Sequence, residues 1–190
     1  MKRILYCIIP LLIILYAVRV FILNSNDVRP LEINYEFGEK VGFENDFFGT
    51  SNECSNGYYI TIIGTDLLTI DEFVQKYNES NSECYEGYEY MYLIHAKFSN
   101  DSNMEGMNAG INLSRYILQD QSYISFMSRE AYCAINDIDI YSFSLRLETE
   151  EELIIPYGID LDYVDINEIA TGKASLVISA YPHKKMISLS

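Results

Sequence analysis

Residues 87–99 read GYEYMYLIHAKFS, and this stretch decides the fold class. Successive side chains of an extended chain point to opposite faces of a sheet. One face of this segment would be aromatic and apolar, formed by Tyr88, Tyr90, Tyr92, Ile94, Ala96 and Phe98. The opposite face would be more polar, formed by Glu89, Met91, Leu93, His95 and Lys97. This period of two residues predicts a β-strand that packs one face against a core.

Similar strands are predicted along most of the remaining chain, where segments alternate in polarity or are rich in β-branched and aromatic residues. They cover residues 31–37, 58–68, 109–118, 122–126, 138–147, 153–159 and 175–181, with a short strand near 41–44 and a continuation over 184–189. Clusters of Asn, Asp, Gly and Ser separate them, and the acidic run 148–152 is interpreted as a charged turn. Short strands separated by turns predict an all-β sandwich.

One helix is predicted within this β-rich region. Thr69 and Glu72 have the spacing of a capping box, in which each side chain bonds the backbone N–H of the other residue. A short helix would therefore run to about Tyr77, with Phe73 and Tyr77 on one face. Residues 128–135 fit a helical turn or a strand equally well.

The N-terminal segment is apolar from residue 4 to residue 23, apart from Arg19, and Lys2 and Arg3 precede it. About 20 apolar residues can cross a bilayer as a helix, and basic residues tend to stay on the cytoplasmic side. Residues 1–23 are therefore predicted to be a single-pass signal anchor with a cytoplasmic N-terminus. Cleavage as a signal peptide is the alternative, although no small-residue cleavage motif stands between Ala17 and Asp27. Residues 24–30 would form a tether, and residues 31–190 an extracellular domain.

The charge of the chain limits its partners. It carries 28 acidic and 13 basic residues, and Lys2, Arg3 and Arg19 belong to the predicted anchor. The remainder therefore has 28 acidic residues against 10 basic ones, a difference of −18. This charge excludes nucleic acid as a partner, because phosphates require positive charge. It fits a solvated extracytoplasmic domain that attracts cations or a basic partner.

Three cysteines lie outside the predicted anchor, so at least one has no partner within the chain. Cys54 and Cys84 both lie in polar, loop-like surroundings, and a disulfide, if one forms, is predicted between them. Cys133 lies among Ala and Tyr and is interpreted as a small core residue. None of the cysteine spacings matches a zinc or redox motif.

An acidic run near the C-terminus is the best candidate for a metal site. Its members are Asp160, Asp162, Asp165 and Glu168. Clustered carboxylates suit calcium, which takes six to eight oxygen ligands. The run is not an EF-hand, because its sixth position is Asp165 where that loop requires glycine. Calcium binding and a solvated acidic loop are the two interpretations.

No catalytic or cofactor motif is present, and a non-enzymatic protein is predicted. His95 and His183 are expected to lie at the surface or in packing contacts. Neither a nucleophile elbow nor a phosphate-binding glycine loop occurs. The tyrosines at 88, 90 and 92 fit a packed sheet face or a surface that binds carbohydrate or peptide.

Three stretches carry a resemblance to a known group of proteins. They are YLIHAKFSN at 92–100, LRLETEEELIIPY at 145–157 and SLVISAYPHKK at 175–185. With the N-terminal anchor, they resemble uncharacterised membrane-anchored proteins of Gram-positive gut bacteria that have an immunoglobulin-like domain. The resemblance implies an immunoglobulin-like β-sandwich displayed outside the cell membrane, and it assigns no catalytic residues.

The expected function is a non-enzymatic role in protein interaction or in support of the cell envelope. Such a domain should expose a sheet edge or an apolar patch to an envelope or surface protein. The alternative is an envelope domain that binds calcium or a small ligand through the loop from Asp160 to Glu168. A hydrolase whose site assembles only in space is a third interpretation.

Overall fold

The computed structural model describes residues 13–22, 29–49, 55–77, 82–104, 110–120, 122–138, 140–166, 169 and 173–190. The chain divides into two compact units, Met1–Pro30 and Leu31–Ser190.

In the N-terminal unit, residues 13–22 form a helix. Among the described residues, no helix combines the length and the apolar character needed to cross a membrane. The remainder of the predicted anchor, residues 1–12 and 23, lies outside the described residues, as does most of the tether. The membrane anchor therefore stays a prediction.

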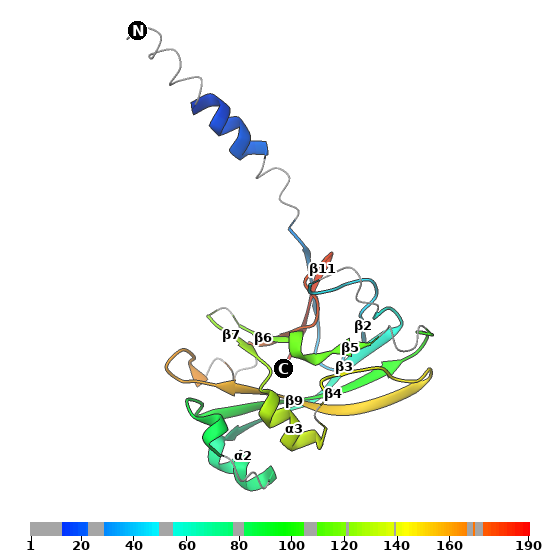
Figure 1. Cartoon of the computed structure of the whole chain (residues 1–190), viewed down its shortest axis with the longest axis vertical. Helices are drawn as coiled ribbons and strands as arrows, with labels where there is room; N and C mark the ends of the chain where they lie inside the picture. Colours follow the sequence, from blue (N-terminus) through cyan, green and yellow to red (C-terminus); the bar gives the residue numbers. More distant parts are fainter. Residues whose placement is uncertain are drawn as a thin grey trace. The chain divides into compact units, whose positions relative to one another are not determined.

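The unit from Leu31 to Ser190 is mainly β (Figure 1). Its five-stranded sheet has the order β1 (Leu31–Tyr35), β11 (His183–Ser188), β10 (Ser175–Val177), β6 (Ile117–Gln119) and β7 (Ile124–Phe126). Its four-stranded sheet has the order β2 (Val41–Gly42), β3 (Tyr58–Thr69), β4 (Tyr90–Asn100) and β9 (Thr149–Ile159). β5 (Ile111–Asn112) and β8 (Ser142–Phe143) form a small third sheet. The pairing of β1 with β11 is parallel, whereas the other described strand pairs are antiparallel.

Strand β4 is at the centre of the four-stranded sheet and supplies both hydrophobic clusters. On one face Tyr92, Ile94, Ala96 and Phe98 are buried in the main core, to which the two larger sheets both contribute. On the other face, Met91 and Leu93 were expected to lie on a more polar surface but are fully buried. They belong to a second cluster with Phe73, Tyr85 and Ala131, which helices and a 3₁₀ turn supply.

Helix α2 (Ile70–Tyr77) begins with the predicted capping box. The backbone N–H of Thr69 donates to Glu72 Oε2 at 2.8 Å, and the N–H of Glu72 donates to Thr69 Oγ1 at 3.3 Å. The rings of Phe73 and Tyr77 lie 5.1 Å apart, as their placement on one face predicts.

A second helix, α3 (Arg129–Asn136), resolves the ambiguity at 128–135 and corrects the expectation of a single short helix. Ser128 caps it by accepting from the N–H of Ala131 at 3.4 Å. At the other end, the Asn136 amide accepts from Ile154 N at 3.0 Å and donates to Ile154 O at 2.9 Å. These two bonds join the helix to strand β9, and α2 and α3 lie against the four-stranded sheet (Figure 1).

Two long predicted strands are wrong. In place of one strand over 109–118, the described residues form β5, a 3₁₀ helix (Leu113–Arg115) and β6. The Asn112 side chain accepts from Ser114 N at 3.1 Å, so this local bond starts the 3₁₀ turn and ends the strand. Within 138–147, β8 is the single strand among the described residues, and it is two residues long.

The interpretation of 148–152 as a turn is also wrong, because β9 begins at Thr149. Glu148 alone takes the turn conformation, with a φ of 57°. Glu150 lies 3.2 Å from Lys97 Nζ across the strand pair. β9 is an edge strand, and exposed charges are common on such edges because they discourage pairing with other chains.

Candidate functional site

The predicted calcium ligands lie in the turn after β9. Asp160 Oδ1 accepts from the N–H of Asp162 at 2.8 Å and so stabilises the turn itself. Asp162 and Asp165 are exposed, and Glu168 lies outside the described residues. Within the described part of the chain, these acids do not bring three ligand atoms together. Calcium binding by this loop stays a prediction.

The predicted disulfide is likewise untested. Cys54 lies outside the described residues, and Cys84 is exposed in a 3₁₀ helix (Ser82–Tyr85). Cys133 is half-buried on α3, close to the packing role expected for it.

His95 takes part in a small ionic group on β3, β4 and α2. Its Nε2 lies 3.2 Å from Asp66 Oδ2, and Lys76 Nζ lies 3.3 Å from the same oxygen. Desolvation raises the pKa of Asp66, but the bonds to His95 and Lys76 outweigh it and hold this pKa below its ordinary value. The group is largely exposed and is interpreted as a surface contact.

The tyrosine stripe mainly packs. Tyr92 is buried in the core, Tyr90 is half-buried against it, and Tyr88 is exposed at the end of the stripe. The stripe therefore does not form a continuous binding surface, although Tyr88 lines a groove described below.

The most unusual group of side chains was not predicted from the sequence, and it forms where the loop after β2 meets the start of β11. Phe43 to Asp46 make a tight turn in which Asp46 N donates to Phe43 O at 3.1 Å and Glu44 has a φ of 55°. Phe47 then pairs with Tyr181 through backbone hydrogen bonds, which brings the loop against β11. The cluster therefore links the four-stranded sheet to the five-stranded sheet.

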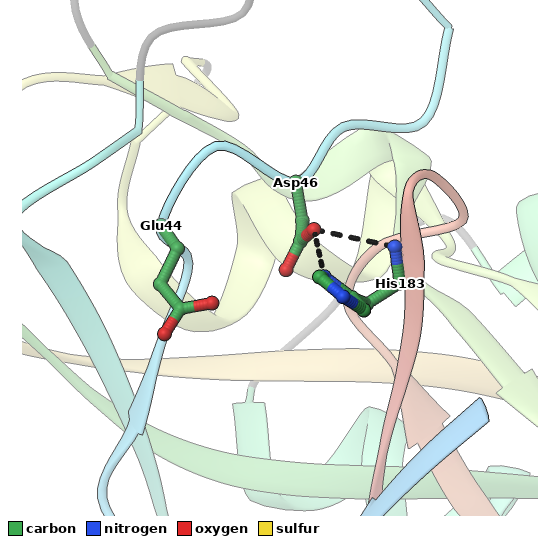
Figure 2. Close-up of side chains that lie close together, drawn as sticks. All are labelled: Glu44, Asp46 and His183. Carbon is green, nitrogen blue, oxygen red and sulfur yellow. Dashed lines mark hydrogen bonds and ion pairs between the residues drawn. The ribbon is translucent and has the colours of Figure 1, made fainter. Parts of the chain in front are cut away.

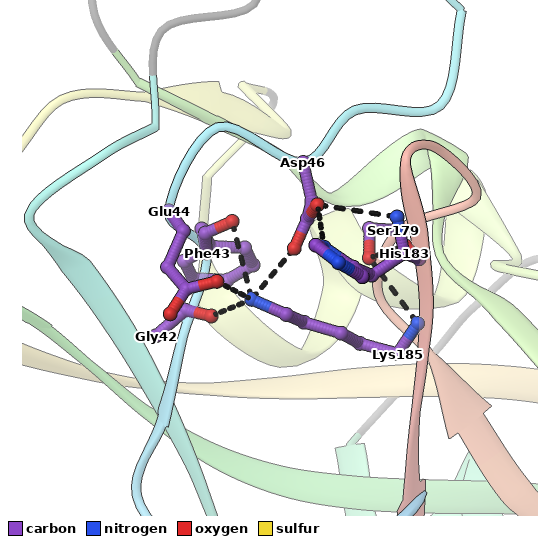
Figure 3. Close-up of polar contacts among 7 residues, drawn as sticks. All are labelled: Gly42, Phe43, Glu44, Asp46, Ser179, His183 and Lys185. Atoms are coloured by element: carbon purple, nitrogen blue, oxygen red, sulfur yellow. Dashed lines mark hydrogen bonds and ion pairs between the residues drawn. The ribbon is translucent and has the colours of Figure 1, made fainter. Parts of the chain in front are cut away.

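Lys185 is at the centre of this cluster (Figure 3). Its side chain is 0% exposed, and that of Asp46 is 2% exposed. The Nζ atom lies 2.7 Å from Asp46 Oδ2 and 2.9 Å from Glu44 Oε2. It also donates to the carbonyl oxygens of Gly42, at 2.6 Å, and Phe43, at 3.5 Å. We call Glu44, Asp46, His183 and Lys185 the lysine cluster.

His183 holds the other oxygen of Asp46 (Figure 2). Its backbone N–H donates to Asp46 Oδ1 at 3.3 Å, and its Nδ1 lies 2.9 Å from the same atom. Ser179 Oγ donates to His183 O at 2.9 Å and accepts from Lys185 N at 3.3 Å. These contacts fix both the aspartate and the lysine backbone in place.

Burial lowers the pKa of Lys185, but the neighbouring carboxylates of Asp46 and Glu44 outweigh burial and raise the pKa above its ordinary value. The resting state of the cluster is therefore an ammonium ion between two carboxylates. An isolated buried lysine would instead lose its proton, because a charge without a partner is costly in a low dielectric.

One oxygen of the cluster has an unusual environment. Asp46 Oδ2 is buried and has no hydrogen-bond partner among the described residues. Its close neighbour is Lys185 Nζ, which lies 2.7 Å away in an ion pair. Buried polar atoms are nearly always hydrogen-bonded, so this atom requires an explanation.

The cluster does not fit a metal ion. Ligand atoms of Glu44, Asp46 and His183 lie within 4.8 Å of one another, which is a spacing that a cation could bridge. However, the ammonium of Lys185 already lies within 2.9 Å of both carboxylates. A cation would be repelled by this charge and would have to displace it.

A signal for Lys185 was present in the sequence. Lys185 and Ile187 share one face of β11, Leu189 follows the strand in the same alternation, and all three are buried. A lysine in line with Ile187 and Leu189 predicts a buried cation that needs acidic partners. The sequence did not identify these partners, because Glu44 and Asp46 come from a distant loop.

The fold and the cluster together define a mainly β domain whose two larger sheets are joined by a buried lysine and its carboxylate partners. The chain matches the model of a domain of unknown function, DUF5028, over residues 32–185, and it belongs to this family. Comparison with curated proteins and with solved structures found no match. All four members of the lysine cluster lie within the matched residues.

Proposed function

We propose that this chain is a non-enzymatic, membrane-anchored protein that presents an immunoglobulin-like sandwich outside the cell and binds another protein of the envelope. A core shared by two sheets supports the sandwich. The apolar segment from residue 4 to residue 23, preceded by Lys2 and Arg3, supports the anchor and its orientation.

The observation that carries the binding role is an exposed apolar groove beside β7. The groove has a volume of about 500 Å³ and lies between β7, the start of α3 and the turn after β9. Its apolar side chains are well exposed, with Ile124 and Phe126 at 60% and Tyr163 at 78%. Large apolar side chains that are exposed together on one surface favour a contact with another macromolecule. We call this feature the β7 groove.

The charge of the domain indicates what the partner should be. Glu130 and Asp160 line the β7 groove, together with Arg129. The domain beyond the predicted anchor has 28 acidic residues against 10 basic ones. The proposed occupant is therefore a protein segment that combines apolar residues with net positive charge, because complementary charge favours encounter and fixes register.

The location is tested by protease treatment of intact cells that express the full chain with a C-terminal tag. In untreated cells we expect the tag to fractionate with the membrane. When protease is added to intact cells, we expect the tag to be digested without lysis. A chain lacking residues 1–23 should lose membrane association. A tag that is protected until the cells are lysed would contradict the proposed orientation.

Binding is tested by chemical crosslinking on the same cells, followed by mass spectrometry of the proteins that co-purify. Phe126→Ser should reduce recovery of a partner, since it removes apolar surface from the β7 groove. Leu147→Ser is the matched control, because Leu147 is also exposed and apolar but does not line the groove. Equal recovery with both variants would contradict a binding role for the groove.

A further inference from the structure

We propose that Lys185 and Asp46 become joined by an intramolecular amide bond between Nζ and Cγ, formed once the domain has folded. The juxtaposition of these two groups carries the inference. They come from opposite ends of the domain, yet both are buried and the reacting nitrogen lies 2.7 Å from Oδ2. This inference does not depend on the proposed function.

Positioning is the first argument. The backbone pairing of Phe47 with Tyr181 and the bonds of Ser179 hold the aspartate loop and β11 together. Two reactants held in contact by a rigid structure react as if at very high concentration. Burial of both groups also excludes bulk water, which would otherwise favour hydrolysis of the product.

The orphaned oxygen is the second argument. Asp46 Oδ2 has no hydrogen bond among the described residues, although it is buried and close to an ammonium. Amide formation expels this atom as water and so removes the unsatisfied group. The atom that remains, Oδ1, keeps its contacts with His183. Amide formation would therefore remove the one Asp46 oxygen that lacks a hydrogen bond among the described residues and would keep the contacts of the other.

The reaction balances without an oxidant or reductant. Proton transfer from Nζ to Asp46 Oδ2 first converts the ion pair into a neutral amine and a carboxylic acid, which is the minor form because the neighbouring carboxylates stabilise the ammonium. The nitrogen lone pair then attacks Cγ and places negative charge on Oδ1, where the backbone N–H of His183 stabilises it. The hydroxyl carrying Oδ2 leaves as water, and the C–N bond replaces one C–O bond.

Glu44 is in position to move the proton between these atoms. Its Oε2 lies 2.9 Å from Nζ, and one of its carboxylate oxygens lies within 4.8 Å of an Asp46 oxygen. It can accept the proton from the attacking nitrogen and return it to the departing hydroxyl. Its side chain is also largely exposed, which gives the released water a route to solvent. The amide can form only once in each chain. Because the ammonium form of Lys185 is stabilised, we expect it to form slowly.

The experiment is the intact mass of the purified, disulfide-reduced full chain under denaturing conditions. The wild type should be lighter than its sequence by about 18 Da, the mass of one water. Protease digestion should yield a branched peptide that joins position 46 to position 185. Lys184→Met is the matched control, because Lys184 is the adjacent lysine but pairs with Glu32 outside the cluster, and this variant should keep the mass loss.

Four variants separate the amide from an ordinary ion pair. Lys185→Met and Asp46→Ala should have their full sequence mass. Asp46→Asn should lose about 17 Da where it reacts, because ammonia leaves in place of water. Glu44→Gln should slow the mass loss at least several-fold in samples taken at matched times after synthesis. A wild type that is folded by near-UV circular dichroism and has its full sequence mass overturns the proposal, as does a water loss that maps to other residues.

Discussion

Tyr132 carries a hydroxyl that is buried and has no hydrogen-bond partner among the described residues. Burial, followed by the nearby Cys133 and Glu151, raises the pKa of this hydroxyl to about 12. A buried polar atom without a partner costs free energy, so Tyr132→Phe should leave stability unchanged or raise it by up to about 1 kcal/mol. Urea unfolding followed by circular dichroism measures this change.

Tyr157→Phe is a suitable comparison for this prediction. The Tyr157 hydroxyl is buried too, but it donates to Tyr116 O at 3.4 Å. Its removal should therefore lower the free energy of unfolding, in contrast to the change at Tyr132. A loss of more than about 1 kcal/mol in Tyr132→Phe would show that this hydroxyl does have a partner.

Asp66 makes the stability of the domain weakly dependent on pH in the acid range. Its folded-state pKa is lowered, so its contribution is present above the unfolded pKa and is lost as pH falls through the lower folded value. The loss should occur below about pH 4, and it should be less than about 1 kcal/mol because the side chains are exposed to solvent.

The measurement is the melting temperature at a series of pH values from about 2 to about 6, a range that brackets the titration of an ordinary carboxyl group. Asp66→Asn should flatten the acid side of this curve, whereas Asp162→Asn, at an exposed turn position, should leave it unchanged. Identical curves for wild type and Asp66→Asn would exclude a contribution from the contact with His95 and Lys76.

At the scale of single elements, the start of α2 can be tested directly. Thr69→Ala removes the hydroxyl that accepts from Glu72 N and should cost about 1 kcal/mol in the free energy of unfolding. Thr69→Ser keeps the oxygen and should retain most of this stability. If the alanine and serine variants unfold at the same urea concentration, the cap does not contribute.

The sequence predicted those elements whose signals are local. The alternation in residues 87–99 identified β4, and the spacing of Thr69 and Glu72 identified α2. The burial of Met91 and Leu93 was not predicted, because it depends on helices that fold back over the sheet. The start of β9 at Thr149 was missed for a related reason, since its acidic residues are tolerated because β9 is an edge strand.

The lysine cluster also could be predicted only in part from local sequence signals. Alternation in the last strand places Lys185 beside Ile187 on the buried face, and this much can be read from the sequence. Its partners are supplied by a tight turn after β2, which approaches β11 only through the tertiary pairing of Phe47 and Tyr181. No local pattern specifies that pairing.

At the scale of the whole molecule, the unit from Leu31 to Ser190 should fold without the N-terminal segment. It has its own core, and residues 1–30 form a separate compact unit. A chain lacking residues 1–23 should be soluble and should show a single cooperative urea transition with near-UV circular dichroism typical of fixed aromatic packing. A fragment without such a transition would contradict the one-domain organisation.

The parallel pairing of β1 with β11 has a mechanical consequence. Leu31 lies beside His183 and Tyr35 beside Ile187, so the first and last strands run side by side in the same direction. Traction applied at Leu31 and Ser190 would draw these strands in opposite directions along their axes. The hydrogen bonds between them would then bear the load together instead of opening one after another, which slows forced unfolding. A domain with this arrangement is suited to withstand tension applied between its first and last strands.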